Sequence, residues 1–186
     1  MNLFAKYQQG LTYAAFLERY ANPVQHERWQ QFHANLQLSA NHRSILTAFR
    51  REMPVLCLAG AWCGDCVNQC PIFERFAELT PTIKLRFLDR DDHADVQQVL
   101  QVNGGNRVPV VVFFSEDGFE VARFGERTLS KYRQLVRDQL GASCPTGIGG
   151  HEDPLVNQVV NDWLNEFERV QWLLCQSPRL RQKHRD

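Results

Sequence analysis

The segment from Pro54 to Leu79 constrains the fold most strongly, because it places two cysteines between a predicted strand and a predicted helix. Residues 55–59 form a short apolar run, which is typical of a buried central strand. Residues 60–64 predict a loop, and a helix is expected from about Cys63, with Pro71 as a kink inside it. The apolar residues of this helix are Ile72, Phe73, Phe76 and Leu79.

Further strands and helices follow along the chain. Strands are predicted over residues 83–88, 109–114 and 119–124, and a short helix over residues 94–101. Ser115 to Gly118 predicts a hairpin turn, and Thr128 is a candidate N-cap for a closing helix. Strands that alternate with helices, followed by a hairpin and a closing helix, predict an α/β sandwich.

The chain divides into five predicted segments. They are a helical N-terminal extension (1–52), an α/β domain (53–142), a Gly-rich linker (143–153), an amphipathic helix (154–176) and a basic, frayed tail (177–186). Asn22–Pro23 and Asp153–Pro154 each predict an N-cap followed by proline at the first helical position. The amphipathic helix is expected to pack against the domain through Val156, Val160, Trp163, Phe167, Val170 and Leu174.

Cys63 and Cys66 are separated by two residues, a spacing that can close a disulfide in the first turn of a helix. The unpaired N–H groups of a helix start favour a thiolate, so Cys63 is expected to ionise readily. A Cys63 thiolate can attack a substrate disulfide, and Cys66 can resolve the mixed disulfide that forms. The pattern therefore predicts thiol–disulfide exchange.

Several motifs together resemble those of the thioredoxin superfamily. Trp62 precedes the cysteine pair, Gly64 follows its first member, and Pro71 lies five residues after its second. Val108–Pro109 resembles the family's cis-proline, and further matches are Asp117–Gly118 at the hairpin turn and Gly125 near the end of the next strand. The resemblance covers residues 54–140, and the flanks are similar to those of bacterial thioredoxin-like proteins with helical extensions.

The resemblance implies a thioredoxin-like three-layer α/β/α sandwich with a central mixed sheet and helical extensions at both ends. It implies Cys63 as nucleophile and Cys66 as resolving thiol, without a metal. It further implies a cis Val108–Pro109 bond beside the pair. Substrate is expected to contact Trp62, Gly64, Asp65, Val108 and Pro109.

Three features depart from the family pattern. Asp65 occupies the place of a proline, and its carboxylate is expected to raise the pKa of Cys63. Cys57 occupies the place of a buried acid that accepts a proton from the second cysteine. Residues 103–106 lengthen the segment before Pro109. These departures bear on the activity more than on the fold.

Charge and composition bear on location and partners. The 21 basic and 21 acidic side chains balance, which argues against nucleic acid or a membrane surface as a partner. Residues 1–13 lack the apolar run of a signal peptide, and no stretch approaches the roughly 20 apolar residues of a membrane span. We therefore expect a cytoplasmic protein, in which the six cysteines are not a structural disulfide framework.

Two functions from different classes remain open at this stage. The first is an oxidoreductase without a bound cofactor, which acts on disulfide-containing proteins or low-molecular-weight thiols and takes electrons from a thioredoxin reductase or a small thiol. The second is a binding module with vestigial redox capacity, whose terminal helices recognise a specific partner. A metal or iron–sulfur site at Cys63, Cys66 and Cys70 is a third reading and lacks a further cysteine. Cys70 is predicted to be a small buried residue, with a third redox thiol as the alternative.

Overall fold

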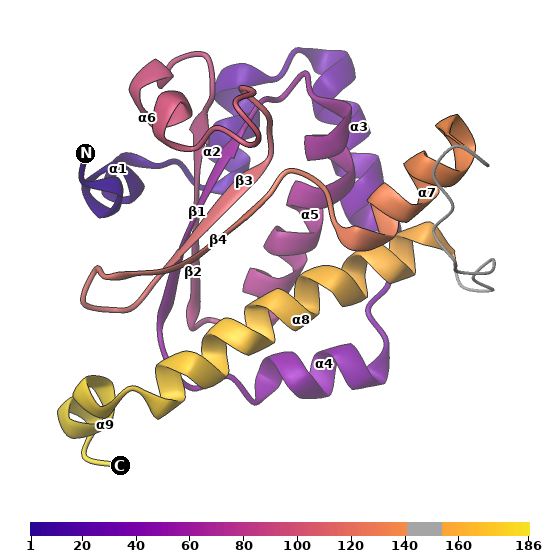
Figure 1. The fold of residues 1–186 in the computed structure, drawn as a ribbon. Coiled ribbons are helices and arrows are strands. Elements are labelled where there is room, and N and C mark those ends of the chain that lie inside the picture. Colours follow the sequence, from indigo (N-terminus) through magenta and orange to yellow (C-terminus); the bar gives the residue numbers. More distant parts are fainter. Residues whose placement is uncertain (141–153) are drawn as a thin grey trace.

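The computed structural model of the protein describes residues 1–140 and 154–186, so the predicted linker of residues 143–153 lies outside the described residues. The helices (Figure 1) are α1 (Leu3–Gln9), α2 (Tyr13–Tyr20), α3 (Pro23–Asn35), α4 (Ala40–Thr47), α5 (Gly64–Leu79), α6 (Ala94–Val99), α7 (Leu129–Gln139), α8 (Leu155–Gln176) and α9 (Pro178–His184). The strands are β1 (Met53–Ala59), β2 (Ile83–Asp89), β3 (Val110–Phe114) and β4 (Glu120–Gly125).

The four strands form one mixed sheet in the order β2-β1-β3-β4. β1 runs parallel to β2 and antiparallel to β3, and β4 pairs with β3 in the antiparallel direction. All seven residues of β1 are buried, as the apolar run predicts for a central strand. The predicted α/β class and mixed sheet are therefore confirmed.

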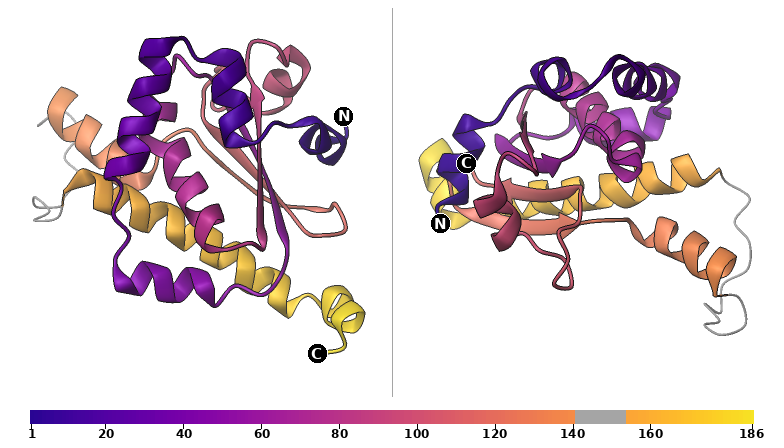
Figure 2. Two further views of the ribbon diagram at one scale, coloured as in Figure 1. Left: turned by 180° about the vertical axis from the view of Figure 1, so that it is seen from behind. Right: turned by 90° about the horizontal axis from the view of Figure 1, so that it is seen from above.

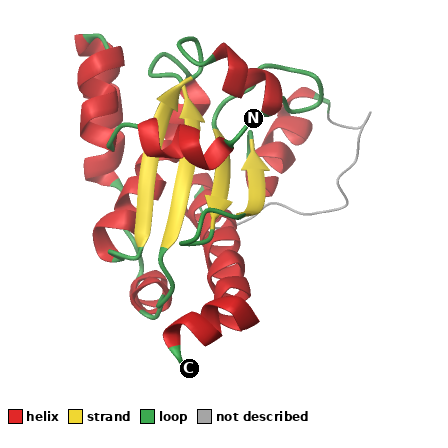
Figure 3. Cartoon of the chain, turned by 90° about the vertical axis from the view of Figure 1, so that its left-hand side faces the viewer, coloured by secondary structure: helices red, strands yellow, loops and turns green. Residues whose placement is uncertain are grey.

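Helices cover both faces of this sheet, which gives three layers. α1 and α6 lie on one face, and Figure 3 shows them in front of the strands. α5 and α8 lie on the other face, where α3 and α4 pack against α5 (Figures 1 and 2). Neighbouring residues of β3 serve opposite faces, because Phe114 contacts Phe4 of α1 whereas Phe113 contacts Phe167 of α8.

Helix α8 is part of the core. The ring of Trp163 lies 4.4 Å from that of Phe73 on α5 and 4.9 Å from that of Phe124 on β4, centroid to centroid. The buried members of its predicted apolar face are Val160, Trp163, Phe167, Val170 and Leu174. Val156, near the helix start, is 37% exposed. The expectation that this face packs against the domain is therefore confirmed for all but its first residue.

The N-terminal helices join the same core. Trp29 of α3 is fully buried and contacts Tyr13 and Phe16 of α2. Both of those rings in turn contact Phe87 of β2. Helices α2 and α3 therefore pack together against β2 as part of the domain core.

Helix starts follow the predicted capping signals in two places. The Asn22 side chain accepts the N–H of N3 and Pro23 occupies the first position of α3, and Thr128 caps α7 in the same way. At α8, Pro154 is itself the N-cap, and Asp153 lies outside the described residues. The expectation of Pro154 at the first helical position is therefore wrong by one residue.

The prediction of a frayed basic tail is wrong. Residues 178–184 form α9, which docks on the acidic hairpin turn between β3 and β4. Arg179 lies 2.5 Å from Asp117, and Lys183 lies 2.6 Å from Glu116. Opposite charges that are distant in sequence order this segment, and a local reading of its composition does not reveal them.

Candidate active site

Helix α5 places its two cysteines at different depths. Cys63 is the N-cap, with extended backbone and a half-buried side chain, whereas Cys66 lies in the first turn and is fully buried. Both are free thiols in this structure. The backbone N–H groups of Asp65 and Cys66 at the start of α5 act to lower the pKa of Cys63, although its side chain makes no capping hydrogen bond. Cys63 therefore lies at the helix start, as the sequence predicts.

The two thiols share their ionisation. The side-chain hydrogen bond to Cys66, together with burial, raises the pKa of Cys63 in the reduced pair. Burial also acts to raise the pKa of Cys66, but hydrogen bonds from the Cys63 and Cys70 thiols outweigh it and lower that pKa. The pair therefore loses one proton readily, and the remaining proton stays on Cys63. The expectation that Cys63 ionises readily is therefore wrong, because the neighbouring Cys66 side chain and burial outweigh the helix start, and the lowered pKa belongs to Cys66.

The segment before β3 meets the cysteine pair. The Val108–Pro109 peptide is cis, as the resemblance implies, and the Cys63 Sγ donates to the carbonyl oxygen of Val108 at 3.6 Å. A Cβ at Gly125 would lie 2.9 Å from the Pro109 carbonyl oxygen, so only glycine permits this approach of β4. The structure thus brings Cys63 and Val108–Pro109 together.

Trp62 forms an exposed apolar surface beside the pair. It is 47% exposed, and the Arg90 guanidinium lies 4.4 Å from its ring centroid. A Cβ at Gly60 would lie 2.7 Å from the indole, so glycine there lets the ring lie flat on the loop. Behind the loop, Trp29 Nε1 donates to the Ala61 carbonyl at 2.9 Å. The N-terminal extension therefore fixes the active-site loop directly.

Asp65 is paired with a cation. Its carboxylate lies 2.7 Å from the Arg127 guanidinium, and Arg127 also lies 3.3 Å from the buried Glu126. Glu126 further accepts hydrogen bonds from Arg107 at 2.8 Å and from the Tyr132 hydroxyl at 3.0 Å. Two carboxylates and two guanidiniums thus balance in charge beside the cysteines.

Gln69 joins this network to both long helices. Its side-chain amide donates to the backbone oxygens of Glu126 at 3.0 Å and of Asp65 at 3.2 Å. Its carbonyl oxygen accepts from Trp163 Nε1 at 2.9 Å. Gln69 therefore ties the first turn of α5 to α8 and to the end of β4.

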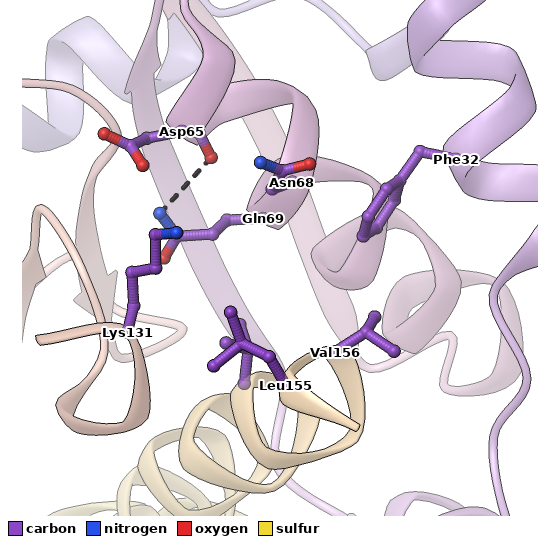
Figure 4. Close-up of a pocket in the computed structure, with 8 residues that line it drawn as sticks. Phe32, Asp65, Asn68, Gln69, Lys131, Leu155 and Val156 are labelled. Atoms are coloured by element: carbon purple, nitrogen blue, oxygen red, sulfur yellow. Dashed lines mark hydrogen bonds between the residues drawn. The ribbon is translucent and has the colours of Figure 1, made fainter. Parts of the chain in front are cut away.

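A cavity of about 170 Å³ opens next to Asp65. Figure 4 shows the side chains of Phe32, Leu155 and Val156 around it, with Asp65 and Lys131 at its polar side. We did not predict this cavity from sequence, since its walls come from four separate helices, α3, α5, α7 and α8.

Three other residues of the site, Arg107, Arg127 and Gln69, are not predicted from the sequence. Arg107 and Arg127 flank recognised motifs, since one precedes Val108 and the other follows Glu126. Gln69 gives one usable signal, because it is a polar residue on the apolar face of the helix that carries the cysteines. The partners of these side chains lie far away in the sequence, so no local pattern reveals them.

Two further properties concern metals and membranes. Among residues 1–140 and 154–186, no three His, Cys, Asp or Glu side chains are arranged to hold a metal ion. No helix in the described part of the chain is long and apolar enough to cross a membrane.

A strand, a Cys-x-x-Cys helix start and an opposing cis-proline together define a thioredoxin-fold protein. The sequence pattern of the family described as thioredoxin matches residues 10–139, well over half of the chain, and the chain therefore belongs to the thioredoxin family. A comparison with curated proteins gave no significant match.

Solved structures are similar in fold. A protein of unknown function from Pseudomonas aeruginosa is 18% identical, with a TM-score of 0.69, over 88% of this chain and 93% of its own. An HIV epitope scaffold is 20% identical, with a TM-score of 0.64, over 87% of this chain and 95% of its own. At these identities the likeness concerns the fold alone, and it extends over the helices that flank the sheet.

Proposed function

We propose that this protein is a thiol–disulfide oxidoreductase that uses Cys63 and Cys66 to reduce or exchange disulfides. The observation that carries the proposal is the position of Cys63. Its half-buried sulfur lies at the start of α5 and 3.6 Å from the Val108 carbonyl, with the buried Cys66 behind it. An accessible attacking sulfur and a protected resolving sulfur are what the exchange requires.

The reaction begins with movement of the remaining proton from Cys63 to Cys66. The Cys63 thiolate attacks one sulfur of the substrate disulfide, so a Cys63–substrate bond forms and the substrate disulfide breaks. The departing substrate thiolate takes the proton held on Cys66. The Cys66 thiolate then attacks the Cys63 sulfur, which closes the Cys63–Cys66 disulfide and releases the second substrate thiolate. The substrate gains two electrons, and the pair loses two.

The exposed surface around the pair suits a chain-like substrate. Trp62 offers an apolar face, and Val108–Pro109 offers backbone next to the Cys63 sulfur. Gly64 leaves the helix start open, because a Cβ there would meet nothing within 4 Å. Asp65 lies between this surface and the cavity. We therefore propose disulfide-containing proteins or low-molecular-weight thiols as substrates.

The oxidised pair needs a source of electrons to turn over. A thioredoxin reductase or a low-molecular-weight thiol would supply them, and a reducing compartment such as the cytoplasm suits this direction of reaction. We propose no nucleic-acid or membrane partner.

Reduction of insulin disulfides, driven by dithiothreitol, tests the proposal. Cys63→Ser should reduce the rate to the uncatalysed background, and Cys66→Ser should accumulate a mixed disulfide through Cys63. Cys175→Ser on α8 is the matched control and should retain full activity. Equal rates for the wild type and Cys63→Ser would contradict the proposal and would favour the alternative, a binding module with vestigial redox capacity that recognises a specific partner.

A further inference from the structure

Two cysteines that the proposed reaction does not use face each other in the core. The sulfur of Cys57 on β1 lies 3.7 Å from the sulfur of Cys70 on α5, and neither side chain has any exposed area. This separation is van der Waals contact, and a disulfide bond is about 1.6 Å shorter. Two free thiols in contact across a strand and a helix are placed to close such a bond.

The same pair connects to the active site. Cys70 follows Cys66 by one turn on the same face of α5, both side chains are buried, and the Cys70 thiol is one of the groups that lower the pKa of Cys66. Since Cys66 lies in the first turn of the helix that Cys63 caps, the four cysteines lie in series from the half-buried Cys63 inward to Cys57. A series of adjacent sulfurs lets a disulfide migrate by exchange.

We propose that Cys57 and Cys70 form a second redox site, which accepts the disulfide from Cys63–Cys66 by internal exchange. This rests on the proposed function, because the active-site pair must first be oxidised by a substrate disulfide. The second site stores that oxidation in the core and returns Cys63 and Cys66 to the dithiol state for another substrate.

The exchange balances without an external oxidant. The Cys70 sulfur attacks Cys66, so a Cys66–Cys70 bond forms, the Cys63–Cys66 bond breaks, and Cys63 takes the proton that Cys70 gives up. The Cys57 sulfur then attacks Cys70, so a Cys57–Cys70 bond forms and Cys66 leaves with the proton from Cys57. Two electrons move from the inner pair to the outer pair.

The spacing of Cys66 and Cys70 on α5 makes the intermediate Cys66–Cys70 disulfide short-lived. Cys66 and Cys70 are one turn apart on α5, where Cβ atoms lie about 5–6 Å apart, and an unstrained disulfide needs about 3.8 Å. Strained disulfides exchange onward more easily. Pro71 has no N–H for the Val67 carbonyl, so the helix lacks one backbone hydrogen bond at this turn and can adjust there.

Counting disulfides by mass spectrometry tests the proposal. The full chain carries Cys144→Ser and Cys175→Ser, so that only the four sulfurs of the series remain. It is oxidised with an excess of glutathione disulfide, alkylated, weighed intact and mapped by digestion. We expect two disulfides per chain, Cys63–Cys66 and Cys57–Cys70. A product that stops at Cys63–Cys66 alone would overturn the second site and leave the proposed function intact.

Two comparisons between variants test separately whether the Cys57–Cys70 disulfide forms and whether it forms by exchange with Cys63–Cys66. In a chain that also carries Cys63→Ser and Cys66→Ser, formation of the Cys57–Cys70 disulfide should slow at least tenfold, and an unchanged rate would overturn the exchange route. In Cys57→Ala, a single Cys63–Cys66 disulfide is expected. If no Cys63–Cys66 disulfide forms in any variant that retains both residues, the proposed function itself fails.

Discussion

The Asp65 carboxylate lies 2.7 Å from the Arg127 guanidinium, so the negative charge between the two cysteines has its own counter-ion. Arg127 lies two residues after the end of β4, and its charge offsets part of the repulsion that Asp65 exerts on a thiolate at Cys66. The sequence alone presented Asp65 as an uncompensated charge.

This pairing predicts opposite effects for two substitutions. Arg127→Gln leaves Asp65 unpaired, so the first pKa of the cysteine pair should rise by about one pH unit. Asp65→Asn should lower it, and the double variant should lie close to the wild type. A thiolate absorbance titration in a background without Cys57, Cys70, Cys144 and Cys175 measures all three. Equal pKa values for Arg127→Gln and the wild type would show that Arg127 does not compensate Asp65.

The Trp29 hydrogen bond to the active-site loop can be tested by Trp29→Phe. The substitution leaves the buried Ala61 carbonyl without its donor, and the free energy of unfolding should fall by about 1–3 kcal/mol. Trp172→Phe is the matched control, because that indole is 44% exposed and should change stability by less than about 0.5 kcal/mol. Denaturant unfolding measures both, and equal effects would contradict a special role for Trp29.

Alanine substitution at two glycines of the site should change the free energy of unfolding in opposite directions. A Cβ at Gly125 meets backbone atoms of Pro109 and Val110 within 3.1 Å, so Gly125→Ala should destabilise by about 1–3 kcal/mol. Gly64 begins a helix with open space around it, so Gly64→Ala should stabilise by up to about 1 kcal/mol. Thermal unfolding compares them. A neutral Gly125→Ala would show that β4 can move away from Pro109.

The contact of α9 with the hairpin turn should depend on pH. The hydrogen bond from Arg179 lowers the pKa of Asp117 to about 2, below its ordinary value near 3.9. The stabilisation is therefore complete above about pH 4 and is lost as the pH falls toward 2. A carboxyl NMR titration should place the Asp117 midpoint near 2 and move it toward 3.9 in Arg179→Gln. An unchanged midpoint would show that Arg179 is not the cause.

Local sequence patterns predict the central strand and the helices that follow it, and they fail to predict contacts between residues that are distant in sequence. The apolar run of β1, the helix start at Cys63 and the Thr128 cap each depend on neighbouring residues, and all three are found in the structure. The packing of Phe113 against Phe167 joins residues 54 positions apart, which periodicity cannot specify. The docking of the basic tail on Asp117 fails for the same reason, since its acidic partner lies 62 residues earlier.

The candidate site shows the same division. Motif spacing identifies Cys63 and Cys66, and family resemblance supplies Val108–Pro109 and Trp62. The charged side chains around these residues come from segments outside the motifs. The role of Gln69 depends on its hydrogen bond with the buried Trp163 indole of α8, which the sequence does not reveal. The reactive residues of one short motif can be predicted from sequence. Their pKa values and positions depend on contacts with residues that are distant in sequence, which only the folded structure shows.

The equilibrium between the reduced pair and its disulfide tests the central claim most directly. The full chain with Cys57→Ala, Cys144→Ser and Cys175→Ser is equilibrated in glutathione buffers of graded potential, quenched with acid and mapped by mass spectrometry. We predict a reversible transition between the Cys63–Cys66 dithiol and its disulfide, with Cys63 as the first thiol alkylated in the reduced form. A pair that stays reduced across all potentials, or alkylation that begins at Cys66, would contradict the account.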